Sequence, residues 1–161
     1  MTAPSAKPKA ARKPARSARR RARELALQGL YQWQMTHADP AWVQAHAQEH
    51  DEFSKCDADF FSTLLLGCIE QSAQLDVRIA PHLDRAVAEL SPVEHAILWI
   101  GTYELLHCPD VPYKVVINEG VELAKAFGGV DGHKYVNGVL DHLALELRPA
   151  EVATAARPPA A

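Results

Sequence analysis

The sequence predicts an all-α protein of about seven helices. Strand patterns are scarce, whereas apolar residues recur at helical spacing from residue 19 to residue 147. Hydrophobic residues make up 48% of the 161 residues, which suffices for one compact domain of ordinary size. We place this domain at residues 19–148. A disordered basic arm at 1–18 precedes it, and a flexible tail rich in Pro and Ala follows at 149–161.

The first half of the domain is expected to contain three helices. The first spans about residues 19–35, where apolar side chains share one sector of the helical wheel: Ala26, Leu27, Leu30 and Trp33. Asp39 and Pro40 supply the N-cap and first position of a short second helix. Asp57 caps a longer third helix, whose apolar face continues to Leu75, and Pro81 ends or kinks the segment after it.

The second half is expected to contain the central helix and two partners. Ser91-Pro92-Val93-Glu94 is a capping box, and the following helix is apolar almost all round, which predicts the most buried element. Pro112 opens the next helix, whose apolar stripe includes Phe127, before Gly128 and Gly129 end it. Asp131 is expected to cap the last helix, which runs to about Leu147.

Catalytic and metal-binding patterns are weak. Glu104 is a carboxylate inside the apolar helix, but no base or nucleophile accompanies it, so we expect a structural ion pair with Arg78 or Arg85. The eight histidines lack the spacing of zinc ligands, and the three cysteines lack C-x-x-C spacing. These patterns predict a protein without enzymatic activity, cofactor, metal or disulfide, in a reducing cytoplasm.

The charge is strongly divided along the sequence. Nine of the 17 Lys and Arg lie in residues 1–23, the basic segment, which contains no acid. The remaining residues hold eight basic and 20 acidic side chains, so a segment of +9 precedes a body of −12. Such an arginine cluster is typical of a polyanion-binding site, although a charge run can also be a solvated tail. Tyr31 follows it as an expected exposed ring for base stacking, whereas Trp33 is expected in the core.

A second basic point lies at the start of the last helix. His133 and Lys134 fall in its first turn, where free backbone amides and the helix dipole favour an anion. Asp131 would repel phosphate unless it caps the helix or shapes a contact. No recognition-helix motif with base-reading side chains stands out, so the pattern favours single-stranded RNA over duplex DNA.

Several blocks of sequence resemble the bacterial transcription antitermination factors of the NusB family. The blocks keep their order and spacing over residues 19–148: RRRARE at 19–24, LYQWQ at 30–34, DVPYKVVINE at 110–119, ELAK at 122–125 and HKYVNGVLD at 133–141. The resemblance implies two packed helical bundles. It also implies a bacterial cytoplasmic protein that binds boxA RNA with the ribosomal protein known as NusE, within the antitermination complex on RNA polymerase during ribosomal RNA synthesis.

The resemblance also assigns roles to individual residues. The implied RNA contacts are Arg19, Arg20, Arg21, Arg23, Tyr31, Asp131, Lys134 and Tyr135. Glu94 is implied to face the NusE-like partner. The arm before Arg19 is longer and more basic than the family requires, so its share of the affinity is expected to include non-specific attraction.

Two other functions fit the same sequence less well. The fold implied by the resemblance also occurs as the leading domain of ribosomal RNA methyltransferases, but the sequence offers no downstream catalytic domain. A helical dimerisation module with an inert basic arm is the other alternative, and it leaves a homodimer open. An integral membrane protein is not expected, because no apolar run approaches the ~20 residues needed to cross a bilayer.

Overall fold

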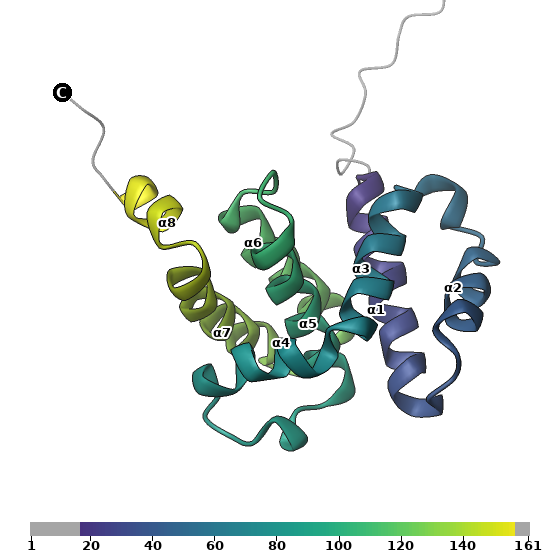
Figure 1. The fold of residues 1–161 in the computed structure, drawn as a ribbon, viewed down its shortest axis with the longest axis horizontal. Helices are drawn as coiled ribbons and strands as arrows, with labels where there is room; N and C mark the ends of the chain where they lie inside the picture. Colours follow the sequence, from purple (N-terminus) through teal and green to yellow (C-terminus); the bar gives the residue numbers. More distant parts are fainter. Residues whose placement is uncertain (1–16, 157–161) are drawn as a thin grey trace, which may run out of the picture.

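The computed structural model describes residues 17–156, and all regular secondary structure within this range is helical (Figure 1). The described residues form eight α-helices and three short 3₁₀ helices, joined by turns and loops. The all-α prediction is confirmed, with one α-helix more than the seven expected. The predictions for residues 1–16 and 157–161 lie outside the described residues.

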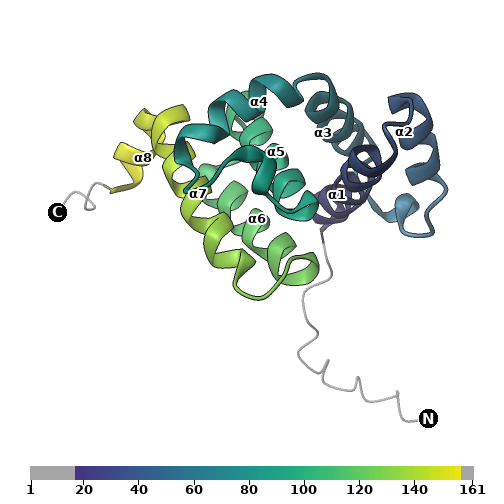
Figure 2. The same ribbon diagram turned by 90° about the horizontal axis from the view of Figure 1, so that it is seen from below.

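The helices form two packed bundles, as the resemblance implies (Figures 1 and 2). Helix α1 packs against α2 and α3 in the first bundle, and α5 packs against α4, α6 and α7 in the second. Contacts of α1 and α3 with α5 join the two. The bounds are α1 Ala18–Thr36, α2 Pro40–Gln48, α3 Ala58–Glu70, α4 Ser72–Ile79, α5 Pro92–His107, α6 Tyr113–Phe127, α7 Gly132–Leu147 and α8 Pro149–Ala156. The 3₁₀ helices are Phe53–Lys55, Ala80–His82 and Val87–Glu89.

Helix α5 is the central element, as its apolar sequence predicts. Most of its residues from Ala96 to Leu105 are buried between the two bundles. Its start is set locally, because the Ser91 hydroxyl accepts a hydrogen bond from the Glu94 amide at 3.1 Å. Gly101 lies where α7 approaches closely, since a Cβ there would be 2.6 Å from Leu140. This tight packing fixes the relative positions of α5 and α7.

One element boundary and one helix cap differ from the prediction. The expected third helix breaks at Gln71 into α3 and α4, although the apolar spacing continues to Leu75. Asp131 occupies the N-cap position of α7 but adopts a left-handed conformation (φ 64°), and its side chain makes no capping hydrogen bond. Its carboxylate instead lies 3.3 Å from the Lys134 ammonium.

The expected flexible tail is wrong for its first eight residues, which form α8. Pro149 opens this helix, and Glu151 accepts a hydrogen bond from the Tyr113 amide at 3.0 Å, so α8 caps the start of α6. Val152 packs against the hydrophobic core. Composition alone predicted a flexible tail. The contacts that hold α8 in place come from residues distant in sequence, which composition does not reveal.

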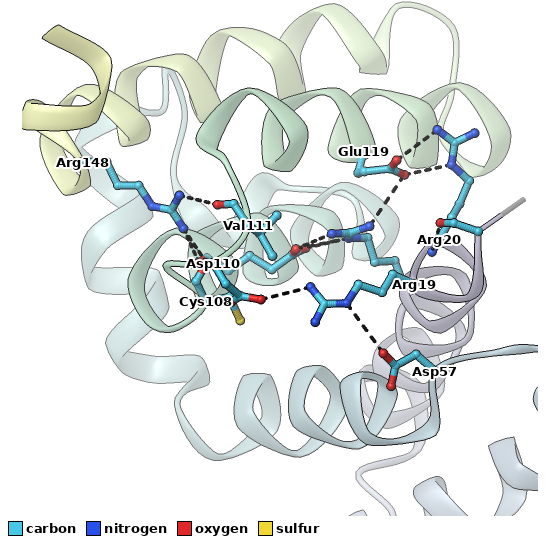
Figure 3. A network of polar contacts seen from close by, with 11 residues as sticks. Arg19, Arg20, Asp57, Cys108, Asp110, Val111, Glu119 and Arg148 are labelled. Carbon is cyan, nitrogen blue, oxygen red and sulfur yellow. Dashed lines mark hydrogen bonds and ion pairs between the residues drawn. The ribbon is translucent and has the colours of Figure 1, made fainter. Parts of the chain in front are cut away.

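The residue that precedes α8 completes the end of α5. Arg148 is buried and donates hydrogen bonds to the carbonyls of Glu104, Leu105, Cys108 and Val111 (Figure 3). These carbonyls lie at or beyond the last turn of α5, where few helical amides remain as donors. The Glu104 and Cys108 carbonyls also accept the Cys108 and Val111 amides, and Arg148 adds a second donor to each. The Arg148 guanidinium therefore caps the C-terminal end of α5 and ties α7 and α8 to it. No helix among the described residues is long and apolar enough to span a membrane.

Candidate nucleic-acid interface

The arginines at the start of α1 project toward carboxylates of the body. Arg19 lies 3.6 Å from Asp57 and 3.4 Å from Asp110, and Arg20 makes a bidentate pair with Glu119 at 2.9 and 3.0 Å (Figure 3). Arg21 pairs with Glu52. The sequence places these arginines in one run, but the helix turns each toward a different neighbour.

Arg23 corrects the predicted site, because it is buried rather than on the surface. Its side chain is 3% exposed and forms a bidentate pair with Glu104, with a shortest contact of 2.7 Å. Its guanidinium also lies 5.0 Å from the ring centre of Phe60. RNA has no access to this group, so Arg23 is a structural residue in this conformation.

The Arg23 pair also corrects the expected partner of Glu104, which was Arg78 or Arg85. Burial raises the pKa of the Glu104 carboxyl, and the hydrogen bonds from Arg23 oppose that rise. The burial of Arg23 could have been predicted from the sequence. Arg23 precedes Ala26, Leu27 and Leu30 by three, four and seven residues, which places it on the apolar face of α1.

The three remaining predicted arginines stay near the surface, each beside an acid. The Arg19 side chain is 44% exposed, which leaves it the most accessible. The hydrogen bond to Glu119 raises the pKa of Arg20, and Arg20, Arg23 and Glu119 together join α1 to α6. A phosphate approaching this face would therefore compete with carboxylates already in contact with the cations.

Tyr31 lies farther along α1 beside an open apolar hollow. The ring is 43% exposed, as predicted, whereas Trp33 packs partly buried against the core. The hollow has a volume of 300 Å³ and is lined by Leu27, Gln28, Tyr31, Val93 and Phe127. Phe127 was expected in the core but is 40% exposed at the end of α6. Two aromatic side chains are thus available to a flat ligand.

The hollow reaches the start of α5 through Val93. Glu94 follows Val93, and its Oε1 would lie 3.2 Å from a Cβ added at Gly132, the first residue of α7. Glu94 therefore has a defined place beside α7. The capping bond at Ser91 uses the backbone amide of Glu94, so its carboxylate is not needed for that bond.

Tyr135 lies in the same region but is not fully open. The Arg85 guanidinium covers one face of its ring at 4.3 Å from the ring centre, and Arg85 itself pairs with Asp84 at 2.8 Å. Partial burial raises the pKa of the Tyr135 phenol. Arg85 is a cation of this region that the sequence patterns missed, because its role depends on the loop before α5.

The predicted residues therefore fall into two sets. The first contains Arg19, Arg20 and Arg21 at the start of α1. The second surrounds the starts of α5 and α7 and contains Glu94, Asp131, Lys134 and Tyr135. Tyr31 and the apolar hollow lie between them along α1, because Tyr31 and Val93 both line the hollow. Within residues 17–156, no group of three or more His, Cys, Asp or Glu side chains could hold a metal ion.

Comparison with known proteins identifies the family. The model of the NusB family matches residues 20–145. The sequence is 61% identical over 143 residues to a protein of Ralstonia pickettii named transcription antitermination protein NusB, covering 89% of this protein and 92% of that one. A protein of the same name from Bordetella pertussis is 55% identical over 151 residues, with coverage of 91% and 98%.

Solved structures agree with the fold. NusB of T. maritima superposes with a TM-score of 0.74 at 28% identity, covering 86% of this protein and 99% of that one. The matching protein in the crystal structure of the antitermination factors NusB and NusE in complex with double-stranded RNA gives a TM-score of 0.72 at 26% identity, covering 78% and 95%. The protein belongs to the NusB family, a family of non-enzymatic RNA-binding proteins of transcription antitermination.

Proposed function

We propose that this protein is a non-catalytic antitermination factor that binds boxA-type single-stranded RNA together with a NusE-like ribosomal protein during ribosomal RNA transcription in the cytoplasm. The observation that carries the proposal is the surface formed by three features: the arginines at the start of α1, the Tyr31 hollow farther along the same helix, and Glu94 beside the start of α7. In this arrangement one strand of RNA and one basic protein can be held side by side.

The α1 end of this surface supplies the electrostatic part of RNA binding. Arg19, Arg20 and Arg21 extend the positive charge of the preceding residues into a fixed helical geometry. Arginine pairs with phosphate through two parallel hydrogen bonds, and each phosphate contact releases counterions and favours binding at low salt. The carboxylates beside these arginines hold them in place before RNA arrives, and phosphate takes over as the partner.

The Tyr31 hollow supplies a place for unpaired bases. The rings of Tyr31 and Phe127 are partly exposed beside the aliphatic Leu27 and Val93. Stacking of a base on an aromatic side chain contributes about 1–3 kcal/mol without strict base preference. Duplex RNA would keep its bases stacked inside the helix, so this hollow favours a single strand.

Glu94 and its neighbours supply the protein-binding part. Glu94 belongs to the acidic body of the protein and lies in the first turn of α5, beside α7. Ribosomal proteins are commonly basic, so a carboxylate at this place can pair with a partner cation. The solved structure of NusB and NusE in complex with double-stranded RNA supports the choice of partner.

The deciding experiment measures RNA binding with and without the partner. Fluorescence anisotropy with boxA RNA and a scrambled strand, across a salt series, should give tight and sequence-dependent binding only when a NusE-like protein is present. Equal affinity for both strands with the partner added would contradict the proposal. A homodimer that binds RNA without any effect of the partner would favour the dimerisation alternative.

A charge reversal tests the protein-binding part separately. Glu94→Lys should weaken capture of the NusE-like protein by at least tenfold while leaving the Ser91 backbone cap in place, because that cap uses the amide. Glu70→Lys is the matched control, since Glu70 is an exposed carboxylate at the end of α3, near the opposite end of α5. Equal partner affinity of the two variants would remove Glu94 from the interface.

A further inference from the structure

A polar groove runs along the outer face of the hairpin formed by α6 and α7. It has a volume of 450 Å³, and both helices line it. Lys114 and Asn118 come from α6, one turn apart, and His133 and Asn137 come from α7, also one turn apart. The floor is aliphatic, with Ile117 buried beneath the polar side chains.

The cations of this groove differ from those elsewhere in the described residues. Lys114 is the one Lys or Arg among residues 17–156 whose side chain makes no ion pair or hydrogen bond. In the same range, His133 is the one histidine of the eight without a side-chain hydrogen bond, ion pair or ring contact. The unpaired Lys114 and the unpaired His133 therefore lie in the same groove, where both can bind a ligand.

The amides of the groove are also unengaged. The sequence contains two asparagines, Asn118 and Asn137, and both line this groove from opposite helices. Both side chains are exposed, and neither forms a hydrogen bond with another described residue. An asparagine amide presents a donor and an acceptor together, which matches the hydrogen-bonding edge of a nucleobase. The adjacent Tyr113 adds an aromatic ring to the same lining.

We propose that the α6–α7 groove binds a second segment of single-stranded RNA, with phosphates on Lys114 and His133 and base edges on Asn118 and Asn137. This inference rests on the proposed function and extends the RNA path beyond the arginines of α1. The groove reaches Lys134 and, through the Lys134–Asp131 pair, the start of α7. A strand leaving the Tyr31 hollow can therefore enter the groove at that end.

The chemistry of the groove favours RNA over an acidic peptide. A peptide rich in carboxylates would use only the cations of the groove and would leave the two amides and the Tyr113 ring without a matching partner. A nucleotide strand can place its phosphates on the cations and its bases on the amides and the ring.

Extended RNA tests the groove in the full-length protein. We compare boxA alone with boxA carrying about 12 further nucleotides, a length that suits an extended binding site. The extension should tighten binding to the wild type about fivefold or more. In Lys114→Gln and in Asn118→Ala this gain should disappear, and Lys114→Gln should lower the slope of log affinity against log salt by ~0.7. Arg78→Gln is the matched control, since Arg78 is an exposed cation of α4 outside the groove.

The outcomes separate the groove from the proposed function. Failure of the wild type to bind boxA, with or without the NusE-like protein, would overturn the proposed function itself. Normal boxA binding with a gain that survives in both groove variants would overturn only the groove. Crosslinks from 4-thiouridine in the extension should map to peptides of α6 or α7. Crosslinks that map elsewhere would also overturn the groove. So would a Lys114→Gln variant that keeps RNA binding but loses binding to an Asp- and Glu-rich peptide.

Discussion

The two basic regions of this molecule differ in what their cations contact. At the start of α1, Arg19, Arg20 and Arg21 each lie against a carboxylate, whereas in the α6–α7 groove Lys114 and His133 contact none among the described residues. A count of charges would rank the arginine region far above the groove. The contacts show that binding a phosphate at α1 requires replacing an existing partner, while the groove presents donors that are free.

The arginines of α1 also differ from one another in burial and in the partners that they contact. Arg23 is buried and belongs to the core through Glu104, while Arg19 pairs with two acids on the surface. Buried pairs become costly when one member is removed, whereas surface pairs contribute about 0–1 kcal/mol. One helix thus carries an arginine buried in the core and arginines paired on the surface, and Arg19 and Arg23 are separated by a single turn.

The largest expected effect is on stability. Glu104→Gln should lower the free energy of unfolding by about 3–5 kcal/mol, because it leaves the Arg23 guanidinium buried without its bidentate carboxylate. Asp110→Asn, which breaks the exposed contact to Arg19, should cost less than about 1 kcal/mol. Urea unfolding followed by circular dichroism gives both values. Similar losses in the two variants would show that the division between core and surface arginines is wrong.

The next effect is on RNA affinity. Replacing Arg19 and Arg21 together by Ala should lower the slope of log affinity against log salt by ~1.4, which is two phosphate contacts of ~0.7 each. The groove variant Lys114→Gln should lower it by half as much. Titrations at several salt concentrations measure the slopes. A double variant whose slope equals that of the wild type would leave the groove as the stronger phosphate site.

A smaller effect with the opposite sign tests the competition at α1. Glu119→Gln removes the carboxylate that pairs with Arg20, so RNA should bind about two- to fivefold more tightly at low salt. Glu70→Gln removes an equal charge at the exposed end of α3, and it should change the affinity less. Equal gains in the two variants would mean that only the total charge matters.

The smallest effect is a dependence of stability on pH. The hydrogen bond from the Tyr113 amide lowers the pKa of Glu151 from its ordinary 4.5. The contribution of this carboxylate to stability is therefore present above pH 4.5 and lost as the pH falls through the lowered pKa. Glu151→Gln should cost less than about 1 kcal/mol at pH ~7, and this cost should shrink as the pH is lowered below 4.5. Urea unfolding across a pH series checks this, and a cost that does not fall in acid would contradict it.

Structural features that depend on residues close together in the sequence were predictable. The Ser91 cap and the buried α5 follow from local chemistry, and the helical spacing of α1 was sufficient to define its apolar face. The break at Gln71 and the formation of α8 were not predictable. The apolar pattern continues through Gln71, and α8 is held by Tyr113 and Arg148, which the sequence alone does not place beside it.

The candidate site shows the same limit. Exposure of Tyr31 followed from its position beside the apolar sector of α1, and the buried character of Arg23 could have been read from that sector as well. The partners of the arginines could not, because Glu52, Glu104 and Glu119 come from three separate segments that only the fold brings to α1. The covering of Tyr135 by Arg85 likewise depends on a loop conformation.

The Arg148 cap has a consequence for the order in which the protein folds on the ribosome. The carbonyls of Glu104, Leu105, Cys108 and Val111 accept hydrogen bonds from a side chain that is synthesised about forty residues later. Until Arg148 leaves the exit tunnel, water must take the place of its guanidinium at these carbonyls. The end of the central helix is therefore secured only after α7 has been made.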